Sequence, residues 1–203
     1  KSLVAKEIHQ GGGRRKRPLI HFNCNSVAPE AVEAELFGQV RGGSHAAKQD
    51  KPEKLDPAHG GTLFLDEVED LPPDIQGKLL HSLQNKTVTR LGDTREKPLD
   101  IRVIAATAVL KSRPSAEILL RRSLFMHLNV FPITCLPLRE RPEDVPSLTS
   151  HLLKLACKQL SRPVPTITER VMQQLQNYAW PGNVRELENI IERAMIFNQG
   201  GSL

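Results

Sequence analysis

The sequence has few aromatic side chains and no long apolar segment. Only 4% of its 203 residues are aromatic, with one Trp and one Tyr, so the core must be built mainly from Leu, Ile, Val and Ala. It has no run of 18 apolar residues, which excludes a membrane-spanning helix, and no signal-peptide pattern follows Lys1. We therefore expect a cytoplasmic location and no membrane partner.

Cysteine is also scarce. Cys24, Cys135 and Cys157 lie far apart and match no metal-ligand spacing, so they indicate reduced thiols in a cytosolic protein. The apolar content of 39% and the charged content of 25% are ordinary for a globular protein. The length allows one medium domain, or a domain of about 140 residues with a smaller one attached.

The chain carries a formal charge of +5, with a pI near 9.3. That balance permits a polyanionic partner, but part of the excess lies in one run, Arg14-Arg15-Lys16-Arg17. A short basic loop is more often solvated surface than a nucleic-acid site, so composition alone does not establish DNA binding.

Hydrophobic patterning predicts strands and helices in alternation up to about residue 136. Predicted strands are 18–23, 62–65, 87–91, 100–107 and 130–136; predicted helices are 1–10, 29–37, 72–83 and 116–127, with a long surface loop or hairpin over 38–61. This order predicts an α/β fold with a three-layer parallel sheet. Further on, helices over 151–160, 168–179 and 183–197 have no strand between them. We expect an α/β domain over 1–136 and a small all-helical subdomain over 137–203.

The strongest local signal is Thr62-Leu63-Phe64-Leu65 followed by Asp66-Glu67. A continuous apolar run suits a strand buried on both faces, and α/β sheets place ligand chemistry at the carboxyl ends of such strands. In an NTPase the first carboxylate helps to hold Mg²⁺, and the second polarises the water that attacks the γ-phosphate. The alternative is a solvent-facing acidic turn.

Lys1-Ser2 opens an amphipathic helix, as do the last two residues of the phosphate-binding motif G-x-x-x-x-G-K-[ST]. The lysine would reach the β and γ phosphates, the serine would approach Mg²⁺, and the helix N-terminus would face the anion. The pair alone is a weak motif, but the acidic pair Asp66-Glu67 follows 65 residues later with a strand and a helix between. We expect the glycine-rich part of the loop upstream of Lys1.

Six segments together resemble the central domain of bacterial sigma-54-dependent activators, which belong to the AAA+ class of ring-forming ATPases. They are NCNSVAPEAVEAELFG (23–38), GGTLFLDE (60–67), LPPDIQGKLLHSLQ (71–84), IRVIAAT (101–107), LNVFPITCLPLRERPEDVPSL (128–148) and YAWPGNVRELENIIERA (178–194). They occur in the family's order and spacing and cover nearly the whole chain. The resemblance implies a P-loop NTPase sheet with a helical lid, ATP and Mg²⁺ as cofactors, and assembly into a hexameric or heptameric ring. It also implies RNA polymerase holoenzyme as a partner, and promoter or enhancer DNA bound through a domain outside this chain.

The resemblance assigns roles to residues at matching positions. Lys1 and Ser2 contact the nucleotide, Ser2 and Asp66 hold the metal, and Asp66 and Glu67 form the catalytic acidic pair. Asn23 matches the residue that pairs with the catalytic glutamate and couples it to the nucleotide state. An amide can hold a carboxylate without abolishing its charge. From its position alone, Asn23 is simply a cap at the end of a strand.

Thr107 matches a sensor position near the γ-phosphate, and Arg185 matches the lid arginine that senses nucleotide. The asparagine that follows the sensor in the family is replaced here by Ala108, which has no polar side chain.

The arginine fingers are a second departure from the family. Two arginines six positions apart normally reach into the neighbouring subunit's site, but here Arg121 fills the first position and His127 the second. An arginine finger is worth about 10³–10⁵ in rate, and histidine is shorter and only partly charged at neutral pH. We therefore expect hydrolysis that is weak, or that is arranged differently from the family's.

The largest departure is at residues 42–47. Family members that remodel sigma-54 polymerase carry GAFTGA there, whereas this chain has GGSHAA, with Ser44 and His45 in place of Phe and Thr. Loss of an aromatic anchor favours loss of the sigma-54 contact. One interpretation is therefore a regulator whose nucleotide acts mainly as an assembly switch. The other is an active ATPase that remodels sigma-54 polymerase.

Overall fold

The computed structural model describes residues 1–40, 54–108 and 120–198. The chain forms two compact units, residues 1–133 and 134–203. Among the described residues, no helix has both the length and the apolar character needed to cross a membrane.

A three-stranded parallel sheet forms the centre of the first unit. Its strands are β1 (Leu19–Asn23), β2 (Thr62–Asp66) and β5 (Arg102–Ala106), in the order β1-β2-β5. Because the strands are parallel, their carboxyl ends lie at one edge, and in the register Asp66 is opposite both Asn23 and Ala106. Residues 62–65 of β2 are buried, as a strand covered on both faces requires.

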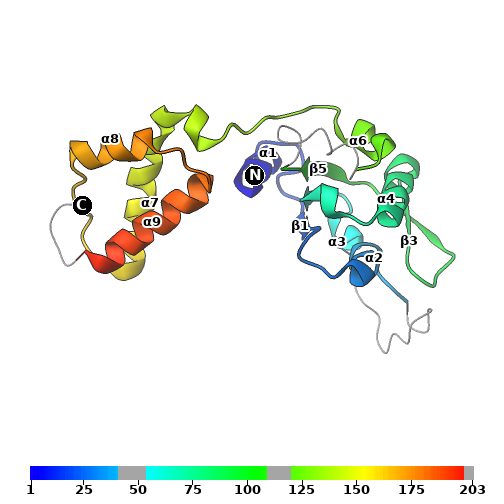
Figure 1. The fold of residues 1–203 in the computed structure, drawn as a ribbon. Helices are drawn as coiled ribbons and strands as arrows, with labels where there is room; N and C mark the ends of the chain where they lie inside the picture. The colour runs from blue at the N-terminus through cyan, green and yellow to red at the C-terminus, as the bar shows by residue number, and fades with distance from the viewer. Residues whose placement is uncertain (41–53, 109–119, 199–203) are drawn as a thin grey trace. The chain divides into compact units, whose positions relative to one another are not determined.

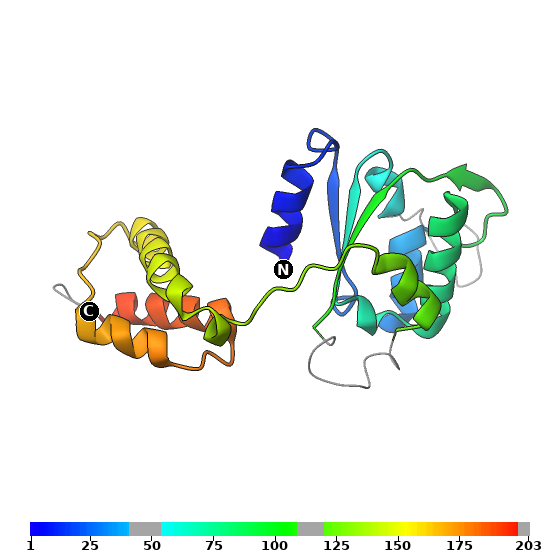
Figure 2. The ribbon, with the colours of Figure 1, turned by 90° about the horizontal axis from the view of Figure 1, so that it is seen from above.

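Helices cover both faces of this sheet. Helix α1 (Ser2–Gln10) lies on one face, and α2 (Pro29–Phe37), α4 (Pro73–Asn85) and α6 (Arg122–Leu128) lie on the other (Figures 1 and 2). A short helix, α3 (Leu55–Ala58), lies on the same side as α2. The core between these layers is aliphatic apart from its phenylalanines and Cys24, with Leu36, Leu63, Leu65 and Leu79 fully buried. The predicted three-layer α/β fold is confirmed.

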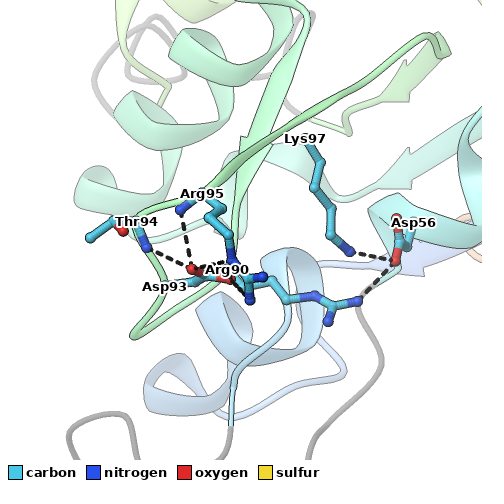
Figure 3. A network of polar contacts seen from close by, with 6 residues as sticks. All are labelled: Asp56, Arg90, Asp93, Thr94, Arg95 and Lys97. Carbon is cyan, nitrogen blue, oxygen red and sulfur yellow. Dashed lines mark hydrogen bonds and ion pairs between the residues drawn. The ribbon is translucent and has the colours of Figure 1, made fainter.

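An antiparallel hairpin, β3 (Thr87–Thr89) with β4 (Glu96–Pro98), projects from this unit. Figure 3 shows that it is tied to α3 by Asp56, whose carboxylate accepts hydrogen bonds from Arg90 at 2.9 Å and from Lys97 at 3.2 Å. The sequence predicted a strand over 87–91 but missed β4, because charged Glu-Lys-Pro residues give no apolar signal. The basic run is likewise partly structural, since Arg14 pairs with Asp100 at 2.7 Å.

The second unit is helical, as predicted for the lid. It contains short 3₁₀ turns at η2 (Leu138–Glu140) and η3 (Pro142–Asp144), followed by α7 (Val145–Leu160), α8 (Glu169–Asn177) and α9 (Asn183–Phe197). Its core gathers around Trp180, which is 1% exposed and donates a hydrogen bond from Nε1 to the carbonyl of Leu175 at 2.7 Å.

The strand predicted over 130–136 is wrong. In the structure this segment begins in a turn, continues without regular secondary structure and pairs with none of the described strands, and Val130 and Phe131 are more than 80% exposed. A segment with the apolar pattern of a strand forms sheet structure only when a neighbouring strand hydrogen-bonds with its backbone N–H and C=O groups.

Candidate functional site

The polar residues predicted from the sequence gather where the strands end. Asn23 ends β1, Asp66 ends β2, and Thr107 directly follows β5. Ligands of open α/β sheets bind at this carboxyl edge, so the topology itself brings the three residues to a position suited to chemistry.

The start of α1 lies at the same edge. Ser2 donates a hydrogen bond from Oγ to Asp66 Oδ2 at 3.4 Å, although the two residues are 64 positions apart. Lys1 is the N-cap of this helix, and both Lys1 and Ser2 are exposed. The structure therefore places the free N–H groups of a helix beside a carboxylate, and those groups favour an anion.

Glu67 has a backbone conformation that is rare for a side-chain-bearing residue. Its φ of 56° and ψ of 49° are left-handed, and it precedes a 3₁₀ turn, η1 (Val68–Asp70). Holding a non-glycine residue there costs on the order of 1–3 kcal/mol, and such residues cluster at functional sites. The conformation turns the chain immediately after β2 and leaves the Glu67 side chain partly exposed.

Asn23 acts as a cap in this structure. Its Oδ1 accepts hydrogen bonds from the backbone N–H groups of Asn25 and Ser26, both at 2.9 Å. The amide oxygen is thus used by the turn after β1 rather than by Glu67. The structure places Asn23 beside Asp66 through the strand register, with the pairing to Glu67 not formed in this conformation.

Two neighbours of the site were not found from the sequence. Glu69 is 8% exposed, and its Oε1 accepts a hydrogen bond from the backbone N–H of Ala108 at 2.8 Å, which fastens the turn after β2 to the segment after β5. His21 stacks on Phe64 with ring centroids 4.8 Å apart, and its Nε2 is 3.7 Å from Asp66 Oδ2. Neither belongs to a short motif, so only the three-dimensional fold shows them.

Carboxylates make this edge electronegative. Burial, and then the charges of Glu69 and Glu67, raise the pKa of Asp70 above its usual value. Burial, followed by the charges of Asp70, Glu69, Asp66 and Glu67, raises the pKa of the Cys24 thiol to about 12.

The buried thiol next to Asn23 gives a testable consequence. With a pKa of about 12, Cys24 has roughly one thiolate in ten thousand at pH 8, whereas Cys135 is exposed. Peptide mass spectrometry after brief iodoacetamide treatment should therefore find Cys135 alkylated and Cys24 intact, even at pH 9, which is still far below the pKa of Cys24. In urea both should react. Equal labelling of the two thiols in the folded protein would contradict the described environment.

The remaining predicted residues lie elsewhere. Arg121 is the N-cap of α6, with His127 in the last turn of that helix, and both side chains are exposed. Arg185 is exposed in the first turn of α9, in the second unit. Ser44 and His45 lie outside the described residues.

Comparison with protein families identifies the chain. The model of the sigma-54 interaction domain matches residues 1–134, and that of the AAA+ ATPase lid domain matches residues 139–203. The chain belongs to the sigma-54 interaction domain family. Its two matched parts correspond to the α/β unit and the helical unit of the structure.

Curated relatives of this sigma-54 interaction domain are transcription regulators. The chain is 42% identical over 203 residues to the DNA-binding transcriptional activator HyfR of Escherichia coli, covering 100% of this chain and 30% of HyfR. It is 41% identical over 194 residues to the response regulator protein PilR of Pseudomonas aeruginosa, covering 96% of this chain and 44% of PilR. The chain thus spans less than half the length of either relative.

Solved structures of NtrX from Brucella abortus share the fold. One matches with a TM-score of 0.88 at 37% identity, covering 98% of this chain and 45% of NtrX. A structure of NtrX in complex with ATP matches with a TM-score of 0.86 at 37% identity, covering 97% of this chain and 44% of NtrX. A further match is NtrX in complex with ADP, with a TM-score of 0.87 at 36% identity, covering 98% of this chain and 43% of NtrX.

Proposed function

We propose that this chain is the nucleotide-binding core of a ring-forming transcription regulator, in which ATP acts chiefly as an assembly switch. The observation that carries the proposal is the hydrogen bond between Ser2 and Asp66, which joins the start of α1 to the end of β2 at the open edge of the sheet. In a family whose member NtrX has been solved with ATP and with ADP, that is where a nucleotide would bind.

The side chains at this edge suit Mg²⁺ and a polyphosphate. Ser2 and Asp66 offer a hydroxyl and a carboxylate oxygen within 3.4 Å, the hard ligands that Mg²⁺ prefers. Lys1, at the N-cap of α1, would neutralise the β and γ phosphates while the helix N-terminus donates its free N–H groups. When bound, the metal would balance phosphate charge, and Glu67 would orient a water for attack.

Assembly would add contacts from other parts of the protein. We propose that Arg121 approaches the γ-phosphate held by a neighbouring subunit, Arg185 senses nucleotide from the lid, and Thr107 reports the γ-phosphate from the end of β5. A ligand can shift a conformational equilibrium only through its different affinity for the two states. ATP, which carries the phosphate that Arg121 would contact, can supply that difference, whereas ADP cannot.

We further propose slow hydrolysis and no contact with sigma-54. Ala108 and His127 replace polar and cationic residues of the family, and Ser44 and His45 replace the aromatic and hydroxyl side chains of its sigma-54-binding loop. The alternative is an active ATPase that remodels sigma-54 polymerase. It is favoured by the presence together of Lys1, Asp66, Glu67, Asn23 and Arg185.

Promoter opening separates the two functions. The full-length regulator, ATP and promoter DNA are incubated with polymerase holoenzyme containing either sigma-54 or the housekeeping sigma factor, and open complexes are detected by permanganate footprinting. We expect no opening with the sigma-54 holoenzyme. Opening that occurs only with sigma-54 would establish the alternative.

A further inference from the structure

A fully buried glutamine connects the catalytic turn to the proposed finger arginine. Gln76 in α4 has an exposed fraction of 0%. Its Nε2 donates to the carbonyl of Leu71 at 2.8 Å, and its Oε1 accepts from the backbone N–H of Arg121 at 2.7 Å. A primary amide can donate to one backbone segment through its nitrogen and accept from another through its oxygen.

The two partners of Gln76 belong to functionally different segments. Leu71 directly follows η1, the turn that begins after Glu67. Arg121 is the N-cap of α6, and its own carbonyl accepts a hydrogen bond from the N–H of Phe125 at 2.9 Å, so the glutamine holds the residue from which that helix begins. One side chain therefore fixes the distance between the turn that carries the catalytic glutamate and the base of the arginine.

Helix α4 also makes room for the guanidinium itself. A Cβ placed at Gly77 would lie 2.8 Å from Arg121 Nη1, closer than real contacts allow. Glycine inside a helix is unfavourable by about 1 kcal/mol relative to alanine. The residue after Gln76 thus leaves the surface of α4 open beneath the arginine, which is otherwise exposed.

We infer that Gln76 is a positioning residue for Arg121. It holds Arg121 at a fixed distance from the catalytic turn of the same subunit, while the arginine acts on the nucleotide of the neighbouring subunit. The inference rests on the proposed function, because it requires Arg121 to act across a subunit interface. Gln76 touches neither nucleotide nor metal in this scheme. It acts through the backbone of Arg121, and removing its amide takes away the acceptor of the Arg121 N–H and the donor to the buried Leu71 carbonyl.

A double-mutant cycle on ATP-dependent assembly tests this role. Sedimentation velocity of the full-length regulator with ATP gives the protein concentration at which half the chains are assembled, for wild type, Gln76→Leu, Arg121→Ala and the double variant. We expect Gln76→Leu to raise that concentration roughly tenfold, as expected when buried partners are left unpaired. The double variant should match Arg121→Ala, because a positioning residue has no effect once the residue it positions is absent.

Three comparisons complete the test. Gln84→Leu, an exposed position on the same helix, should assemble like wild type. Gln76→Glu is the conservative variant: in this buried site its carboxyl is favoured in the neutral form, which accepts from Arg121 and donates to Leu71, so it should assemble nearly as well as wild type. Binding of a fluorescent ATP analogue to unassembled Gln76→Leu should be unchanged, which also shows that the variant is folded.

Distinct results overturn distinct claims. Additive effects of Gln76→Leu and Arg121→Ala, or no effect of Gln76→Leu while Arg121→Ala impairs assembly, would overturn the role of Gln76. If Arg121→Ala leaves ATP-dependent assembly unchanged, Arg121 does not have the role assigned to it in the proposed function. If Gln76→Leu does not fold, Gln76→Met decides, because it keeps the length of the side chain and removes both hydrogen bonds. An assembly defect that is absent from the Arg121→Ala background supports the inference, and an additive defect or no defect contradicts it.

Discussion

Replacing Lys1 by alanine is expected to weaken ATP binding about 30-fold or more. Lys1 caps α1 beside Asp66 and Ser2, and its ammonium is proposed to neutralise the β and γ phosphates. Removing one partner of a desolvated charge pair costs about 2–5 kcal/mol, and each 1.4 kcal/mol is a factor of ten in affinity. Isothermal titration calorimetry of the full-length regulator with MgATP measures the change.

The matched control is Lys6→Ala on the same helix. Lys6 is also exposed but lies more than one turn beyond the start of α1, so its replacement should leave ATP affinity within about twofold of wild type. Equal losses for the two variants would mean that the net charge of the helix, rather than Lys1, attracts the nucleotide. If Lys1→Ala binds ATP as tightly as wild type, the nucleotide does not bind at this edge of the sheet.

Replacing His127 by arginine is expected to raise the ATPase rate by at least tenfold. His127 takes the position of the second arginine finger and lies exposed in the last turn of α6. A finger arginine delivers a permanent charge to the transition state and is worth about 10³–10⁵ in rate. If the lack of a second finger arginine is what makes hydrolysis slow, His127→Arg should restore part of this rate enhancement. Phosphate release at a protein concentration above assembly measures the rate.

Met126→Arg adds the same charge one residue earlier on the same helix, where the side chain is 65% exposed. It should leave the rate near that of wild type. If His127→Arg and Met126→Arg accelerate phosphate release equally, the gain comes from the added charge on α6. If neither does, His127 is not the reason for slow hydrolysis.

Much of the fold follows from local sequence pattern. The apolar run 62–65 predicts a buried central strand because both faces of β2 are covered, and α2 begins and ends at the predicted residues, with Pro29 at its first position. The carboxyl edge follows in turn, since parallel strands bring Asn23, Asp66 and Thr107 together whatever their separation in sequence.

Other features depend on tertiary contacts that a local pattern does not encode. The pattern of residues 130–136 suits a strand, yet the segment lacks a neighbour among the described strands. Asn23 was assigned to a switch by resemblance, and its amide oxygen instead caps a turn in this conformation. Glu69 and Gln76 occupy ordinary-looking positions whose importance comes from bonds to Ala108 and Arg121, 39 and 45 residues away.

ATP is proposed to drive assembly of the regulator and to be hydrolysed slowly. Steady-state phosphate release by the full-length regulator, measured across protein concentrations that span assembly and compared with sedimentation in ATP and in ADP, tests it most directly. We expect ATP but not ADP to produce the assembled form, and phosphate release per chain to stay low throughout. Rapid turnover that rises in step with assembly would contradict it and would identify the chain as part of an active motor.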